Sequence, residues 1–159
     1  MGGSEVFAGN RTVATINELI MRCRAGGNPV IFVQYKDEYL VPGSERWDLL
    51  SALDVRGDDA LVSKRHGSAF HETLLDESLR AAGISRVLVC GMQTESCVDS
   101  ACRHAFTLGN NVEPVADTRT TFDSPALSAS QIVDHLNTTL RTYCDVVPAE
   151  SIVFESREI

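Results

Sequence analysis

The feature that most constrains this chain is a short apolar run, followed by a glycine turn and then a cysteine that opens a helical pattern. The run is RVLVC at 86–90, and its β-branched residues and short length predict a strand buried on both faces of a parallel sheet. Gly91 ends the strand, and apolar residues recur at helical spacing from Cys97 to Phe106. We therefore expect Cys97 in the first turn of a helix, where unpaired N–H groups and the helix dipole favour a thiolate.

The rest of the chain alternates between strand and helix patterns. Further strands are expected at 29–34, 60–64, 111–116 and 151–154, and helices at 12–25, 71–82 and from Pro125 onward, with a short helical stretch at 44–50. Pro114 lies inside one of these strands and indicates a sheet edge or a bulge, because proline lacks an N–H. The alternation predicts an α/β fold over residues 1–159 as one domain: a doubly wound, mostly parallel sheet with helices on both faces.

Charge and hydropathy exclude several classes of partner. The net charge is −8, from 14 basic and 22 acidic side chains, which argues against nucleic acid or an anionic membrane surface. No run approaches the roughly 20 apolar residues of a membrane span, so a cytoplasmic protein is expected. The chain has no G-x-G-x-x-G loop, which weakens the alternative of a nucleotide- or flavin-binding domain, and no cofactor is expected.

Two side chains stand out as candidates for chemistry. Five cysteines without a C-x-x-C pair indicate neither a disulfide framework nor a structural zinc site. Cys97 alone lies at a strand-to-helix junction, whereas the others fall in apolar runs or on helix faces: Cys23, Cys90, Cys102 and Cys144. A buried apolar cysteine remains the alternative for Cys97. Lys64 ends a buried strand, at the edge where parallel sheets bind ligands, and a solvated lysine is its alternative.

Residues 91–99, GMQTESCVD, resemble the G-x-x-T-[DE]-x-C-V motif of the isochorismatase-like cysteine hydrolases, which include nicotinamidases and N-carbamoylsarcosine amidohydrolases. The similarity runs from about Ser4 to Ile152 and includes the strand that ends in Lys64. It implies that Cys97 is the nucleophile and that Lys64 lies beside the sulfur. It also implies a cis Met92–Gln93 peptide, with the N–H groups of Gln93 and Cys97 forming the oxyanion hole.

The chain departs from the family pattern at its start. In the family, an apolar first strand followed by D-x-Q carries an aspartate that acts as general base, and no such run precedes Thr12. We therefore expect that the chain begins inside the family's domain, without that strand and its aspartate. Possible substitutes are the carboxylates of Asp37, Glu38, Glu95 and Asp99. Because an unpaired central edge invites pairing with another chain, a homo-oligomer is expected.

The expected activity is hydrolysis of a C–N bond in a small amide through a cysteine thioester. The alternative is a catalytically impaired relative that serves as a binding or oligomer-forming protein. Six residues are expected at the substrate-binding walls: Met92, Trp47, Tyr35, Tyr39, Phe70 and Phe122.

No metal site is predicted. The family's metal-dependent nicotinamidases carry Asp-x-His after the second strand, where this chain has no histidine. His66 and His71 are five residues apart, which fits poorly on one helix face.

Overall fold

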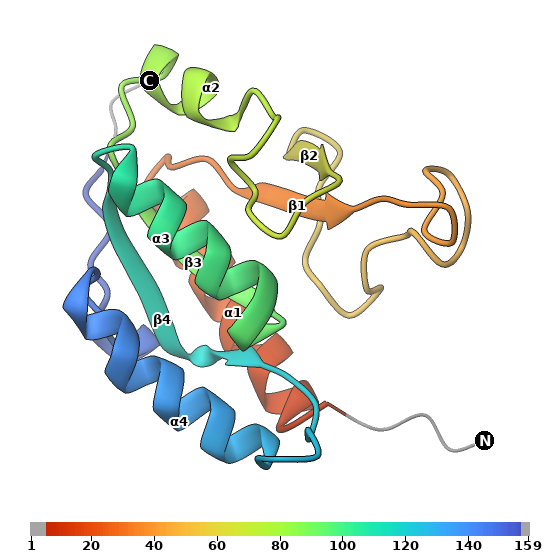
Figure 1. Cartoon of the computed structure of the whole chain (residues 1–159). Coiled ribbons are helices and arrows are strands. Elements are labelled where there is room, and N and C mark those ends of the chain that lie inside the picture. The colour runs from red at the N-terminus through yellow and green to blue at the C-terminus, as the bar shows by residue number, and fades with distance from the viewer. Residues whose placement is uncertain (1–5, 157–159) are drawn as a thin grey trace.

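The computed structural model describes residues 6–156 of the chain. Its elements are, in order, α1 (Gly9–Ala25), β1 (Ile31–Tyr35), β2 (Ala60–Lys64), α2 (Leu75–Ala81), β3 (Arg86–Met92), the π-helical turn η1 (Thr94–Val98), α3 (Asp99–Thr107), β4 (Asn111–Thr120), α4 (Ala129–Thr139) and two 3₁₀ turns, Leu140–Thr142 and Ala149–Ser151 (Figure 1). None of these helices is both long and apolar enough to cross a membrane.

The described strands form two parallel pairs. In one, β1 pairs with β2 from Ile31 opposite Ala60 to Tyr35 opposite Lys64. In the other, β3 pairs with β4, and the register shifts between Val89 and Gly91, where Pro114 lies opposite Val89. Of the two alternatives that Pro114 indicates, a sheet edge or a bulge, the structure therefore contains an irregularity of the bulge type. Within the described residues, neither pair hydrogen-bonds to the other.

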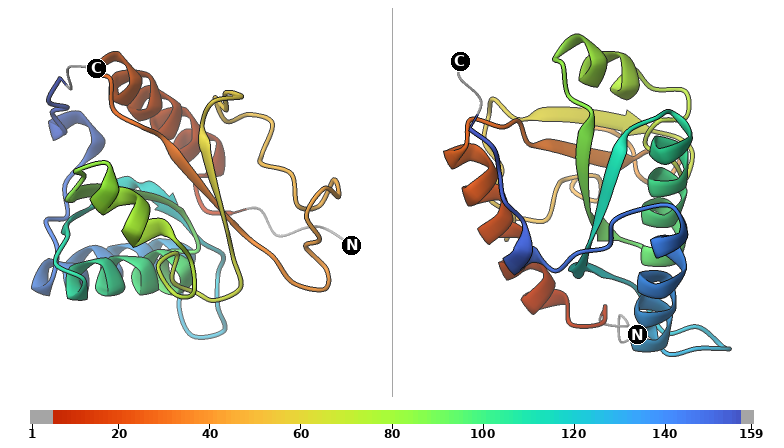
Figure 2. Two further views of the ribbon diagram at one scale, coloured as in Figure 1. Left: turned by 90° about the horizontal axis from the view of Figure 1, so that it is seen from above. Right: turned by 90° about the vertical axis from the view of Figure 1, so that its left-hand side faces the viewer.

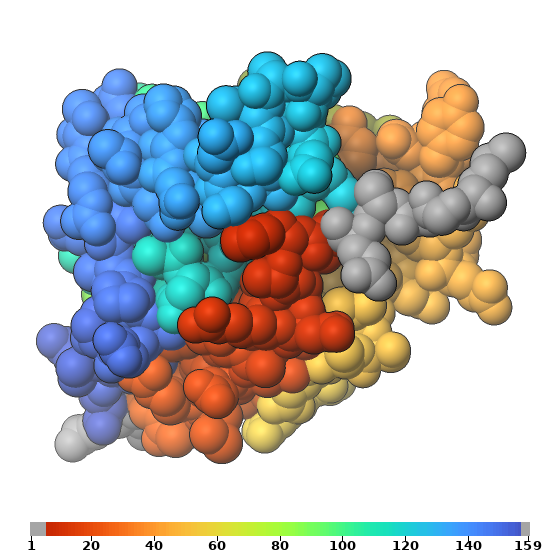
Figure 3. All heavy atoms as spheres, turned by 90° about the horizontal axis from the view of Figure 1, so that it is seen from below, coloured from red at the N-terminus to blue at the C-terminus, as the bar shows by residue number. Residues whose placement is uncertain are grey.

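Helices cover both faces of the β3–β4 pair, which confirms the expected doubly wound α/β fold (Figure 2). Alternate residues of β3 point to opposite faces, as the period of a strand requires. Val87 and Val89 pack against the cluster formed by α3, α4 and β4. Leu88 and Cys90 pack on the other side, with Leu19 of α1. In the view from below, part of the chain around β4 is visible between α1 and α4 (Figure 3).

A third cluster joins the two strand pairs. Leu75 and Leu79 of α2 pack with Ala101 of α3, and Ile31 of β1 and Val87 of β3 both pack against this cluster. Both strand pairs therefore share one core cluster with α2 and α3.

Two helices begin later than the sequence pattern predicts. The helix expected at 71–82 begins at Leu75, because Glu72 has φ +53°, which a right-handed helix cannot contain. The helix expected from Pro125 begins at Ala129. Ser124 forms a turn with the N–H groups of Ala126 and Leu127, and Ser128 with Gln131 makes a capping box.

Two other expected elements do not form. Residues 44–50 make turns, with the N–H of Trp47 donating to the carbonyl of Ser44 at 2.9 Å. Residues 151–154 are not a strand, because Ser151 closes a 3₁₀ turn and Arg22 binds the carbonyls of Ala149 and Ile152. The local apolar pattern was right about burial of Ile152 but wrong about its backbone.

Candidate active site

Cys97 lies half-buried in the π-helical turn η1, between the carboxyl end of β3 and the start of α3. The N–H of Val98 donates to the carbonyl of Gln93 at 3.2 Å, which is the wide i→i+5 spacing of a π-helix. The expectation that Cys97 lies in the first turn of an α-helix is therefore wrong in detail, since α3 begins two residues later at Asp99. The strand-to-helix junction itself is as expected. Single π-helical turns are frequent at functional sites.

The Met92–Gln93 peptide bond is cis, as the resemblance implies. Met92 ends β3 with 46 % of its surface exposed. Gln93 follows with an extended backbone and precedes η1. The backbone of Gln93 and the sulfur of Cys97 therefore belong to one compact loop.

The turn that carries Cys97 is fastened to the end of β4. Thr94 is fully buried, and its hydroxyl donates to the carbonyl of Thr120 at 3.0 Å. The Glu95 carboxylate accepts a hydrogen bond from the Thr121 hydroxyl at 2.8 Å. These two hydrogen bonds hold the loop against the carboxyl end of β4. Thr120 ends β4 and Thr121 follows it, and neither was among the site residues expected from the sequence.

Lys64 ends β2 and is only 5 % exposed. Its ammonium group donates to the carbonyl of Gly67, so the lysine is held by the loop that follows it. A solvated lysine is therefore not what the structure contains. A lysine is seldom buried without partners or a role, which keeps Lys64 among the candidates.

The loop after Lys64 rests on the helix after Cys97. Gly67 lies against Ser100, close enough that a Cβ at position 67 would be 3.1 Å from the Ser100 hydroxyl oxygen. The Ser68 hydroxyl and His104 Nδ1 are 3.0 Å apart. Because Ser100 is one helical turn beyond Cys97, these contacts tie the carboxyl end of β2 to the helix that follows the cysteine. Neither Gly67 nor Ser100 was singled out from the sequence.

The expected pocket residues are divided among several parts of the molecule. Phe70 packs against two core clusters and lies 6.0 Å from His104 between ring centroids. Phe122 is half-buried just after β4. Tyr35 and Tyr39 are 38 % and 76 % exposed. Trp47 is half-buried, and among the described residues its indole N–H is buried without a hydrogen-bond partner. Of these aromatic residues, Trp47 is the one that lines either of the two hollows described next.

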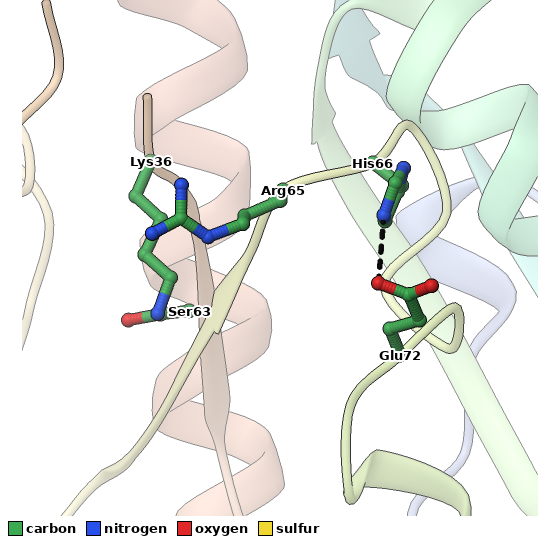
Figure 4. Close-up of a pocket in the computed structure, with 5 residues that line it drawn as sticks. All are labelled: Lys36, Ser63, Arg65, His66 and Glu72. Atoms are coloured by element: carbon green, nitrogen blue, oxygen red, sulfur yellow. Dashed lines mark hydrogen bonds and ion pairs between the residues drawn. The ribbon is translucent and has the colours of Figure 1, made fainter. Parts of the chain in front are cut away.

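Two hollows lie near β1 and β2. One, of about 480 Å³, is lined by Trp47, Gln34, Leu61 and the loop at 48–55. The other, of about 250 Å³, is lined by Lys36, Ser63, Arg65, His66 and Glu72 (Figure 4). Cys97 lines neither of these two hollows.

Three of the four substitute carboxylates are already engaged. Asp99 binds Arg103 at 2.9 Å one helical turn away. Asp37 accepts the N–H groups of Tyr39 and Leu40 in its own loop. Glu95 accepts from Thr121, as described above. Glu38 is exposed.

The structure also assembles a group that the sequence argument had set aside. His66, His71 and Glu72 lie with their ligand atoms within 4.8 Å of one another. Helix spacing does not bring these residues together, because residues 66–72 form a loop and not a helix. The pattern H-x-x-x-x-H-E was the available signal.

Comparison with known proteins decides the family. Residues 1–140 match the isochorismatase domain family, which covers most of the chain. The chain belongs to the isochorismatase family. A solved isochorismatase family protein superposes with a TM-score of 0.89 at 28 % identity, over 92 % of this chain and 89 % of that one. The fold and the resemblance inferred from residues 91–99 are thus confirmed.

Two curated members of the isochorismatase family show the range of named activities. A streptothricin hydrolase from Streptomyces noursei is 29 % identical over 128 residues, which are 79 % of this chain and 51 % of that protein. A ureidoacrylate amidohydrolase from Agrobacterium fabrum is 29 % identical over 140 residues, which are 68 % of this chain and 61 % of that protein. The chain spans about half the length of the first relative and about three fifths of the second.

Proposed function

We propose that this isochorismatase-family chain hydrolyses a C–N bond in a small amide, with Cys97 as nucleophile. The observation that carries the proposal is the position of Cys97 in a fixed turn at the carboxyl end of β3, beside a loop tied to buried Lys64. Two relatives named as a hydrolase and an amidohydrolase support the reaction class. We further propose a cytoplasmic protein that works as a homo-oligomer on a small-molecule substrate.

In the proposed reaction, the Cys97 sulfur attacks the amide carbonyl carbon and forms a tetrahedral oxyanion. Collapse of this intermediate breaks the C–N bond, and the amine leaves with a proton while a thioester to Cys97 remains. Water then hydrolyses the thioester and releases the acid. The N–H groups of Gln93 and Cys97 would stabilise the oxyanion, and the Lys64 ammonium would favour the thiolate.

A second candidate function is that of a catalytically impaired relative that binds a ligand or a partner copy. The observation that favours it is the engagement of Asp37, Glu95 and Asp99 with other groups, because a general base needs a free acceptor near the thiol.

A panel of small amides assayed for release of ammonia or amine separates the two candidates. Turnover that is lost in Cys97→Ala and retained in Cys23→Ala supports the hydrolase. Cys23 is a suitable control because it is a half-buried cysteine on α1, outside the proposed site. Turnover retained in Cys97→Ala, with the same circular dichroism as the parent, would remove Cys97 as the nucleophile. Binding without turnover in the parent protein would favour the impaired relative.

A further inference from the structure

Two histidines and a glutamate face one another in the loop between β2 and α2. His66 Nε2 lies 3.0 Å from Glu72 Oε2, and His71 Nε2 lies 3.8 Å from Glu72 Oε1. The two imidazole rings meet edge to face with centroids 4.4 Å apart. Two nitrogens and a carboxylate within 4.8 Å match the three-ligand sets that hold Zn²⁺ and related ions, where each ligand atom lies about 2.0–2.2 Å from the metal.

The backbone of this loop is held in an uncommon conformation that brings the three ligands together. Glu72 has φ +53°, in the left-handed region that glycine normally occupies. The neighbouring Thr73 hydroxyl donates to the carbonyl of Ala69 at 2.6 Å, which fixes the turn on the other side. A glutamate kept where glycine is preferred indicates that its side chain has a role there.

The ion pairs of His66 and His71 with Glu72 contribute little to stability. The side chains of His66, His71 and Glu72 are 44, 52 and 70 % exposed, and exposed ion pairs contribute little to stability. Neutral imidazole and carboxylate are, in contrast, good ligands for divalent transition metals. His104 lies outside the group, since its Nδ1 faces Ser68 and its ring is 6.4 Å from that of His71.

We propose that His66, His71 and Glu72 bind one divalent transition-metal ion, with Zn²⁺ as the representative ion. Figure 4 shows His66 and Glu72 on one side of the 250 Å³ hollow and Lys36 and Arg65 on the other, with the Arg65 side chain extending toward Lys36. With three protein ligands, the ion keeps at least one coordination position for water or another small ligand. Lys36 and Arg65 would favour an anionic ligand, such as a carboxylate, in that position. The site is independent of Cys97 and of the proposed hydrolysis.

The test is titration of metal-free protein with Zn²⁺ by calorimetry, and with Co²⁺ by visible absorption. We expect one ion per chain and a Co²⁺ spectrum of low coordination number. His71→Gln and Glu72→Gly should each weaken binding by about 10-fold or more. Glu72→Gly is informative because glycine suits φ +53°, so the loop keeps its shape while the ligand is lost.

His135→Gln is the matched control, because His135 is an exposed histidine on α4 outside the group. Unchanged affinity in His135→Gln, together with the losses above, supports the site. Equal affinity in all three variants would overturn it and place the ion elsewhere, for example on a cysteine. Absence of stoichiometric Zn²⁺ binding by the parent protein would also overturn it. The melting temperature of each variant, measured in excess chelator, checks that the fold is unchanged.

Discussion

Gly67 packs directly against Ser100, so that a Cβ at position 67 would lie 3.1 Å from the serine hydroxyl oxygen. The contact joins the loop that binds the Lys64 ammonium group to the helix that follows Cys97. This close approach, together with the Ser68–His104 contact, links the segments of two candidate residues that are 33 positions apart (97 − 64).

Gly67→Ala should therefore destabilise the protein and disturb the proposed site. Crowding of this kind costs about 1–3 kcal/mol where the neighbours cannot move freely. We expect a lower urea midpoint, and a fall in any amide turnover larger than the loss of folded protein explains. Gly57→Ala is the matched control, because a Cβ at Gly57 meets nothing within 4 Å. If the two variants had the same stability and turnover, the Ser100 side chain would have moved to make room for the added methyl group without cost.

Cys97 should react with iodoacetamide faster when Lys64 is present. Lys64→Met keeps most of the buried stem and removes the cation that favours the thiolate. We expect the alkylation rate of Cys97 near pH 7, followed by mass spectrometry, to fall several-fold. Lys36→Met should leave the rate unchanged, because Lys36 lines the hollow beside His66 and not the Cys97 turn. Equal alkylation rates in the parent and in Lys64→Met would show that Lys64 does not influence the Cys97 sulfur.

Stability should fall at alkaline pH because of Cys90. Burial raises the pKa of the Cys90 thiol to about 11, and a hydrogen bond with Thr118 opposes part of that rise. In the unfolded chain the Cys90 thiol ionises near the ordinary pKa of cysteine. Its contribution to the free energy of unfolding is therefore complete below about pH 8.5 and is lost as pH rises toward 11. The loss amounts to at most about 2.7 kcal/mol for a rise from 9.0 to about 11.

Urea unfolding at pH 7 and pH 10 measures this effect. In Cys90→Ser the hydroxyl does not titrate in this range, so the difference between the two pH values should shrink relative to the parent protein. Other groups that titrate in both proteins cancel in the comparison. An identical pH dependence in the two proteins would mean that Cys90 does not contribute.

Association between copies should depend on exposed leucines that line the hollow with Trp47. Leu61 and Leu50 are 56 % and 57 % exposed near the hollow that contains Trp47, and exposed apolar patches favour association. We expect light scattering to give a mass above the 17.3 kDa of one chain, and Leu61→Lys to lower it. Leu74→Lys, at a leucine that is 69 % exposed just before α2 and does not line that hollow, should leave the mass unchanged. A monomeric parent protein would contradict the expectation of a homo-oligomer.

The sequence by itself determined the parts of this protein that depend on local periodicity. The run at 86–90 predicts a strand, because its residues are β-branched and too few for a helix, and β3 forms there with these residues partly buried. The order of Gly91, Cys97 and the apolar helix face then placed the cysteine at a strand-to-helix junction, and the motif at 91–99 indicated the isochorismatase family. Lys64 at the end of a strand was found in the same way, but the expectation that this strand is buried is wrong, because Ala60 and Leu61 of β2 are exposed.

The tertiary structure decided what depends on loops and on contacts between distant segments. The left-handed backbone of Glu72 shortened α2 and brought His66 and His71 together, although their spacing fits no helix face. The hydrogen bonds of Thr94 and Glu95 to the end of β4, and the approach of Gly67 to Ser100, join residues far apart in the chain. Periodicity carries no information on such contacts, because they follow from how packed elements meet and not from the spacing of residues within one element.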